Sequence, residues 1–188
     1  MGECEVVLGI DACPGGWVAV ELRDGLFAGA SIATGLRSLL RGPATGPGGV
    51  VAVDMPLGLL DTGWRRLSRQ SWGLAAKLRE ANDCLADTGG ERLFEVHPEV
   101  SFWALNDRTP LPHRKKSWSG QMTRRSLLAA AGIVLPDDLG EAGRAQPDDV
   151  LDAAAAAWSA HRIAQGRAGC LPDPPQCDER GRPIAIWY

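Results

Sequence analysis

Short apolar runs separated by turn residues open the chain. Residues 5–12, 17–22 and 26–32 are rich in apolar and β-branched side chains, and short turns, CPGG and RDG, separate them. The pattern predicts three strands, because β-branched residues favour extended backbone and very short connections join antiparallel neighbours. We therefore expect the fold to begin with an antiparallel meander.

The rest of the chain alternates helical patterns with strand patterns. The run at 50–56 is continuously apolar until a proline ends it, which is typical of a buried strand. The other expected elements are a helix at 34–41 with Thr34 as N-cap, a helix at 64–86, a strand at 92–96, a helix from Pro98 to about Asn106, a helix at 121–132, a helix at 147–166, a proline-rich coil at 171–183 and an edge strand at 184–188. This order predicts a mixed α/β fold in one domain, residues 1–188.

The composition of the chain excludes several classes of protein. The chain has 45% hydrophobic and 23% charged residues with a net charge of −3, which excludes a uniformly basic nucleic-acid-binding protein but allows a local basic patch. It has no apolar stretch long enough to span a membrane and no secretory leader pattern at its start. Its five cysteines form no C-x-x-C pair. We therefore expect a cytoplasmic protein with reduced thiols and no membrane partner.

Three expected strands carry an acid where an apolar residue would be usual. Asp11 ends VVLGID, Asp54 follows VVAV, and Glu95 lies inside LFEVH. Alternation along the first strand puts Asp11 on the same face as Val7 and Gly9. Because an ionised carboxylate without a partner is costly to remove from water, three such acids on separate strands suggest a shared cation.

The helix expected at 147–166 supplies further acids. Asp149 and Asp152 are three residues apart and therefore lie on one helical face, just after Asp148. Oxygen ligands of this kind suit Mg²⁺ or Mn²⁺ better than zinc, and two such ions can assist phosphodiester cleavage. The predicted site consists of four metal ligands, with a fifth acid as a further ligand or proton acceptor: Asp11, Asp54, Asp149 and Asp152, and Glu95.

Each acid also has a structural interpretation. Asp149 would stabilise the N-terminus of any helix through the helix dipole, and Asp152 could be a solvated acid of the second turn. Asp11 could cap the CPGG turn, and Asp54 could accept hydrogen bonds from nearby backbone amides. Glu95 could pair with an arginine.

A basic segment at residues 108–125 carries six Lys and Arg residues and no acid. Because the whole chain has a net charge of −3, the remaining residues together carry −9. Cations beside an acidic metal site suit phosphate contacts, and an aromatic ring there could stack on an unpaired base. The alternative is a solvated loop and helix face. The predicted nucleic-acid-binding residues are Arg114, Lys115, Lys116, Trp118, Arg124 and Arg125.

Several motifs in combination resemble the domain of unknown function (DUF) 429 family. They are GIDACPGGWVAVEL, VAVDMPLGLL, FEVHPEVSFWALN, KKSWSG followed by RR, and PDDVLDAAAAAWSAHRIAQG followed by LPD and DERGRPIAIWY. Members of that family are described as predicted nucleases with an RNase H-like fold. The resemblance implies a five-stranded mixed sheet of order 3-2-1-4-5 flanked by helices.

A more distant resemblance links the chain to the Holliday-junction resolvases of the same superfamily. In those enzymes a first-strand Asp, an acid on the fourth strand and a D-x-x-D-A motif on the last helix bind two metal ions. Carried over by position, the resemblance implies these roles for Asp11, for Asp54, and for Asp149 with Asp152 in DVLDA.

Between Leu60 and Arg92 the chain departs from the family, whose members usually have a longer stretch with an Arg/Asp/Arg signature and a Ser-Val-Phe motif. This departure motivates the alternative of a non-catalytic RNase H-like binding protein. A third hypothesis is an actin-like binder of nucleotides or sugar phosphates, because GIDACPGG resembles the D-x-G turn of that class, although a second ATP-binding half is missing. The leading hypothesis is a Mg²⁺- or Mn²⁺-dependent nuclease, with a homodimer left open.

Overall fold

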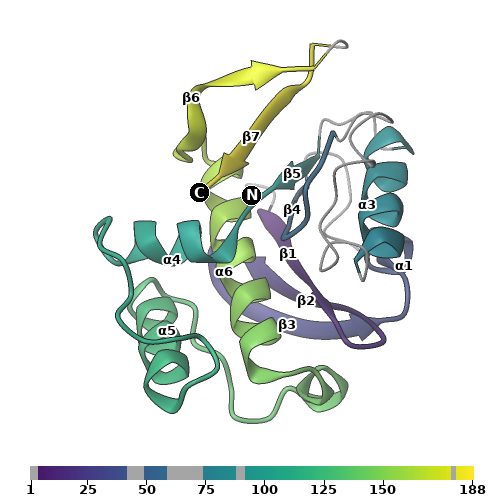
Figure 1. The fold of residues 1–188 in the computed structure, drawn as a ribbon. Coiled ribbons are helices and arrows are strands. Elements are labelled where there is room, and N and C mark those ends of the chain that lie inside the picture. Colours follow the sequence, from purple (N-terminus) through teal and green to yellow (C-terminus); the bar gives the residue numbers. More distant parts are fainter. Residues whose placement is uncertain (1–3, 42–48, 59–73, 88–91, 179–180) are drawn as a thin grey trace.

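A central mixed sheet organises the fold (Figure 1). The computed structural model describes residues 4–41, 49–58, 74–87, 92–178 and 181–188. Strands β1 (Val6–Cys13), β2 (Gly16–Arg23) and β3 (Leu26–Ala33) form the expected antiparallel meander. The sequence pattern of the first 33 residues is therefore sufficient to define this half of the sheet.

Two parallel strands complete the sheet beyond β1. Strand β4 (Val50–Val53) pairs with β1, and β5 (Leu93–Glu95) pairs with β4, both in parallel. The resulting order is β3-β2-β1-β4-β5 in a sheet of five strands. This confirms the order and the strand directions that the resemblance to an RNase H-like family implied.

Helices cover both faces of the sheet (Figure 1). Helix α6 (Pro147–Ala164) packs on one face, where α4 (Pro98–Leu105) and α5 (Trp118–Ala130) pack against it in turn. A short 3-10 helix, η3 (Gly140–Arg144), precedes α6. Helices α1 (Leu36–Leu39) and α3 (Ala75–Asp87) cover the opposite face. Successive side chains of β1 point alternately to these two faces. Val7 packs in the core under α6, whereas Leu8 and Ile10 pack in the core under α3.

Helix α6 touches the backbone of β1 without intervening side chains. A Cβ atom built on Gly9 would lie 1.9 Å from the backbone N of Ala157 and 2.2 Å from the carbonyl O of Ala153. The residues of α6 at this contact are small, since Ala153 and Ala157 are fully buried alanines. Glycine on the strand and alanine on the helix therefore set the distance between these two elements.

Two local predictions were wrong. Thr34 does not cap α1, whose N-cap is Gly35 and lacks a side-chain hydrogen bond. The proline-rich segment expected as coil contains strand β6 (Cys170–Cys177), which pairs with β7 (Pro183–Trp187) in a separate two-stranded sheet. A strand that pairs along a single edge tolerates proline, because its outward N–H groups are not needed.

The C-terminal hairpin projects from the edge of the main sheet (Figure 1). A parallel bridge between Val96 and Trp187 links β7 to the chain just after β5. The helix expected at 64–86 is observed from Ala75 to Asp87, and its predicted start at 64–73 lies outside the described residues.

The described cysteines are all free thiols. In the part of the chain that the structure describes, none of the helices combines the length and apolarity needed to cross a bilayer.

The contact at Gly9 leads to a stability prediction. Replacing Gly9 with Ala forces β1 and α6 apart, and such overpacking should lower the free energy of unfolding by about 1–3 kcal/mol or more. Gly29→Ala, in strand β3, is the matched control, because a Cβ on Gly29 meets nothing within 4 Å. Urea unfolding of both variants measures the difference. Equal stability of the two variants would contradict the close packing of α6 on β1.

Candidate metal centre

Parallel pairing brings two aspartates to the same edge of the sheet. Strands β1 and β4 are in register with Ile10 opposite Val53, so Asp11 and Asp54 each follow a paired residue. The backbone N–H of Asp54 donates to the carbonyl of Ile10 at 2.9 Å. Alternation along each strand turns both carboxylates toward the face that α6 covers.

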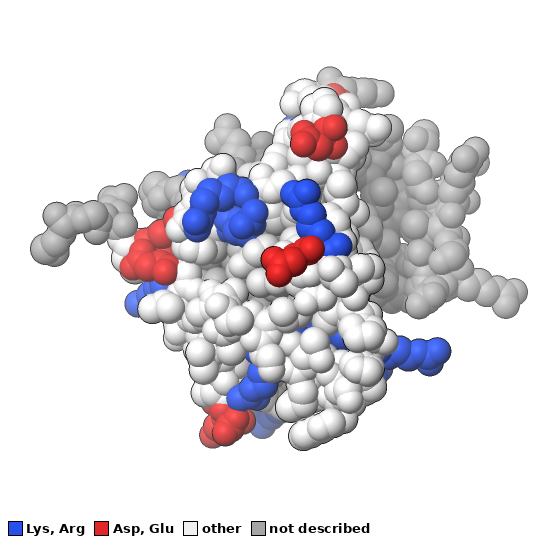
Figure 2. Space-filling view, turned by 90° about the vertical axis from the view of Figure 1, so that its left-hand side faces the viewer, with Lys and Arg blue, Asp and Glu red and all other residues white. Residues whose placement is uncertain are grey.

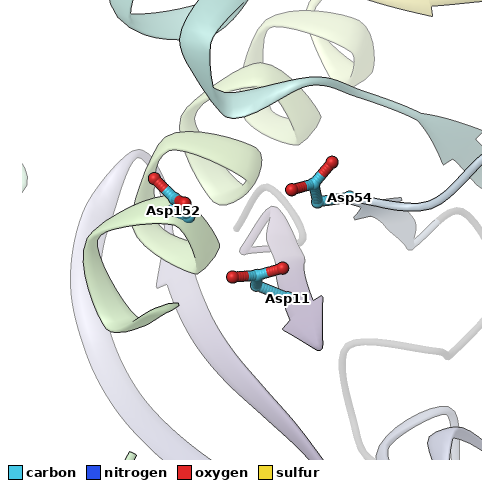
Figure 3. A group of neighbouring side chains, drawn as sticks. All are labelled: Asp11, Asp54 and Asp152. Carbon is cyan, nitrogen blue, oxygen red and sulfur yellow. The ribbon is translucent and has the colours of Figure 1, made fainter. Parts of the chain in front are cut away.

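Helix α6 supplies a third carboxylate from above this face. Proline at the first turn starts the helix, and Asp152 lies one turn further on, directly before the alanines that contact β1. One carboxylate oxygen from each of Asp11, Asp54 and Asp152 lies within 4.8 Å of the others. The three side chains point toward a common space from two strands and a helix (Figure 3). We call this group the aspartate triad.

Burial makes negative charge in the triad unfavourable. The side chains of Asp11 and Asp152 are buried, with 6% and 1% of their surface exposed. Burial raises the pKa of Asp11 to about 9, and the nearby charges of Asp54 and Asp152 add to this rise. Burial also raises the pKa of Asp54, whereas the charges of His97 and Lys115 lower it. The site therefore favours a bound cation, which would compensate charge that solvent does not reach.

Asp152 is incompletely satisfied. Its Oδ2 accepts a hydrogen bond from Lys115 Nζ at 2.6 Å, but its buried Oδ1 has no hydrogen-bond partner. Burial raises the pKa of Asp152 to about 6, against the lowering effect of this bond to Lys115. A buried carboxylate oxygen without a partner, in a group of oxygen donors only, fits Mg²⁺ or Mn²⁺.

Asp149 lies beside the triad but not within it. It is half-buried in the first turn of α6, and its buried Oδ2 lacks a hydrogen-bond partner. Burial raises its pKa, and the charge of Asp148 adds to the effect. Asp149 therefore makes no capping hydrogen bond to α6, and it is not one of the three aspartates whose oxygens lie within 4.8 Å of one another. Its role as a metal ligand stays a prediction.

Glu95 also lies outside the triad. Its Oε2 accepts a hydrogen bond from the backbone N–H of Leu57 at 2.9 Å, so its partner is a backbone amide and not the arginine considered above. Burial raises its pKa, the bond from Leu57 lowers it, and the charge of Asp54 raises it again. Glu95 is thus electrostatically linked to the triad through Asp54.

Only part of the basic segment faces solvent near the triad. Arg114 and Lys116 are exposed, Lys116 lies 3.7 Å from Asp148, and Trp118 is 76% exposed at the start of α5. Lys115 is half-buried and bonded to the triad. Lys115 and Lys116 thus each pair with an acid in the first turns of α6.

The two arginines of the basic segment that lie on α5 have protein partners. Arg124 is buried, with 2% exposed, and binds both oxygens of Glu99 at 2.7 and 2.9 Å. Arg125 donates to the carbonyl of Leu135 and to Asp137. The guanidinium of Arg124 therefore stabilises the packing of α4 against α5, which differs from the phosphate contact expected from the sequence.

Charge on this side of the molecule is mixed. Figure 2 shows separate groups of Lys and Arg on the face that carries α4 and α5, with acidic side chains between and beside them. The basic segment therefore does not form one continuous basic strip on this face, because part of its charge is used in internal ion pairs.

Helix α3 supports the loop before β2 through contacts that the sequence did not predict. Lys77 Nζ donates to the carbonyls of Cys13 and Gly16, the latter at 2.7 Å. Glu80 accepts hydrogen bonds from Trp17 Nε1 and from the backbone N–H of Leu36. The two side chains are three residues apart on one helical face, a spacing visible in the sequence, but their partners depend on the tertiary fold.

Comparison with known proteins identifies the family. The family model described as "Protein of unknown function (DUF429)" matches residues 9–67 and 64–177, so the chain belongs to this family. No curated protein sequence matches the chain.

Solved structures of RuvC have a distant similarity to this chain. RuvC of T. thermophilus in complex with a Holliday junction substrate is 16% identical, with a TM-score of 0.42, covering 87% of this chain and 97% of RuvC. A second Thermus thermophilus RuvC structure is also 16% identical, with a TM-score of 0.39, covering 86% of this chain and 97% of RuvC.

The raised pKa of Asp11 predicts how stability depends on pH. Between the ordinary value of 3.8 and about 9, folded metal-free protein keeps a proton on Asp11 that the unfolded chain releases. Asp11 therefore makes the free energy of unfolding fall as pH rises through this window. Asp11→Asn removes this effect, so its stability relative to wild type should increase by up to about 1.4 kcal/mol for each pH unit.

Urea unfolding in EDTA at pH 5 and pH 8 measures this difference. Asp83→Asn, on the exposed surface of α3, is the control and should show no such gain. A difference between Asp11→Asn and wild type that is the same at both pH values would contradict a protonated Asp11.

Proposed function

We propose that this member of the DUF429 family is a divalent-metal-dependent nuclease, and that the aspartate triad is its catalytic centre. The observation that carries the proposal is the convergence of three carboxylates, from β1, β4 and α6, within 4.8 Å in a largely buried site. Such an arrangement lowers stability unless a cation is bound, and perturbed carboxylates of this kind are characteristic of functional sites.

The residues present fit Mg²⁺ or Mn²⁺. Asp11, Asp54 and Asp152 would hold the metal, and the free Oδ1 of Asp152 is available as a ligand atom. When bound, such ions polarise a phosphoryl oxygen and lower the pKa of a water molecule, which is the chemistry of phosphodiester hydrolysis. The three carboxylates would hold the ions in place, and their negative charge would balance the positive charge of the metal.

Two further acids have supporting roles in this proposal. The unpartnered Oδ2 of Asp149 makes it the candidate for a second ion next to the triad. The charge of Asp54 contributes to the raised pKa of Glu95, which makes Glu95 the candidate proton acceptor beside the triad. These assignments extend the triad by residues that are half-buried at its border.

Nucleic acid would be bound by the exposed part of the basic segment. Arg114 and Lys116 offer charge to phosphates, and the exposed ring of Trp118 offers a surface for stacking on an unpaired base. The segment reaches the triad through Lys115. A phosphodiester bound along it would therefore lie next to the carboxylates.

A non-catalytic binding protein is the second candidate. The observation that favours it is the ion pair between Lys115 and Asp152, which already neutralises part of the triad without any metal. The two candidates differ in their response to Mn²⁺. A nuclease binds the ion and cleaves nucleic acid, whereas a non-catalytic protein with a degenerate triad neither binds Mn²⁺ nor cleaves.

Cleavage assays test the proposal. With Mn²⁺ or Mg²⁺, the protein should hydrolyse at least one of branched DNA, RNA–DNA hybrid, single-stranded DNA and single-stranded RNA, and EDTA should abolish the activity. Asp11→Asn, Asp54→Asn and Asp152→Asn should each reduce the rate at least about 100-fold, because even residues that support metal ligands indirectly can cost that much.

Asp83→Asn serves as the matched control, since it removes an exposed aspartate of α3 and should cleave like wild type. Absence of cleavage on every substrate, or undiminished cleavage by the triad variants, would refute the nuclease proposal.

A further inference from the structure

The segment between α4 and α5 places a positive charge inside the triad. Lys115 Nζ lies 2.6 Å from Asp152 Oδ2, and their side chains are 38% and 1% exposed. The charge of Lys115 also lowers the pKa of Asp54, so the ammonium acts on two of the three carboxylates. In the absence of metal, Lys115 is thus the counter-ion of the site.

The backbone around Lys115 is held independently of that ion pair. Arg124 donates to the carbonyl of His113 at 3.2 Å, and Ser117 Oγ donates to the carbonyl of Arg114 at 2.8 Å. The N–H of Gly120 in turn donates to Ser117 Oγ. Because these contacts fix the backbone on both sides, Lys115 can change partner by rotating its flexible four-carbon side chain alone.

A divalent ion and the ammonium compete for the same carboxylates. The ion carries twice the charge of Lys115, and two cations that share Asp152 would repel each other strongly at this short distance in a buried site. The half-exposed side chain of Lys115 gives it a route to solvent, whereas Asp152 on α6 has none. The lysine is therefore the partner that can leave.

We propose that Lys115 is an exchangeable counter-ion that occupies the triad in metal-free protein and leaves Asp152 when a divalent metal ion binds. This inference rests on the proposed function, because it assigns a metal ion to the triad. The released ammonium then lies beside the site, where the phosphate of a bound nucleic acid would be a new partner.

Chemical labelling tests the exchange directly. The chain has three lysines, Lys77, Lys115 and Lys116, so an amine-reactive acylating reagent followed by mass spectrometry resolves each of them. Mn²⁺ should accelerate labelling of Lys115 several-fold, because an ammonium bonded to a buried carboxylate reacts slowly. Lys77 donates to two backbone carbonyls and not to a carboxylate of the triad, so Mn²⁺ should change its labelling rate less than that of Lys115.

Asp152→Asn provides the comparison within the same assay. This variant keeps the shape of the side chain but loses its charge, so Lys115 should label rapidly with or without Mn²⁺. If calorimetry shows that Mn²⁺ binds wild type while the labelling rate of Lys115 does not change, the lysine stays in place and the exchange is refuted. The metal site itself would survive that result.

Metal affinity supplies a second readout without any nucleic acid. Lys115→Met removes the competing cation, so its affinity for Mn²⁺ at pH 8.5 should exceed that of wild type by about tenfold or more. Lys116→Met is the matched control and should change the affinity less, because Lys116 is 77% exposed and 3.7 Å from its acid. Unchanged or weaker affinity in Lys115→Met overturns the exchange alone, whereas no Mn²⁺ binding to any form overturns both the exchange and the nuclease proposal.

Discussion

The close contact of α6 with β1 determines how near Asp152 lies to Asp11. At Gly9 the strand presents only backbone, and the alanines of the helix lie directly on it. Asp11 is two residues beyond Gly9 on the same face, and Asp152 immediately precedes Ala153, whose carbonyl is at the contact. A larger residue at either contact surface would move the helix outward and separate the two carboxylates.

Bringing acids together in this way has an energetic cost. Burial and the charges of Asp54, Asp152 and Asp149 disfavour the charged form of Asp11 and raise its pKa to about 9. Lys115 offsets part of this cost at Asp152, but it leaves Oδ1 of that residue without a partner. A purely structural core would not need three carboxylates at this point, since apolar residues of similar volume would pack there at lower cost. The arrangement is thus best explained by a ligand of opposite charge.

Parts of the fold and of the aspartate triad could be predicted from the sequence. The strand pattern and the alternation of Val7, Gly9 and Asp11 predicted the meander and the face on which Asp11 lies, and both are confirmed. The resemblance to the family added the sheet order, which brings Asp54 next to Asp11. The meander and the face of Asp11 depend on local patterning, which short stretches of sequence encode, whereas the sheet order came from the resemblance alone.

Other features depend on contacts between distant residues, which a single sequence does not reveal. The burial of Arg124 follows from Glu99, 25 positions earlier, and from the packing of α4 on α5. The partner of Lys115 is 37 positions away on α6, and nothing in the basic pattern distinguished Lys115 from Lys116. Strand β6 was not predicted, because its prolines argue against a strand. Proline is compatible with β6 because this strand pairs with β7 on one side only, which the sequence does not reveal.

The most direct test of the account is an anomalous diffraction map from a crystal grown with Mn²⁺. We expect a manganese peak bonded to carboxylate oxygens of Asp11, Asp54 and Asp152, with the Lys115 side chain turned away from Asp152. A map with no manganese at these residues, at a concentration where other metal sites of similar donors fill, would contradict the assignment of the triad as a metal centre.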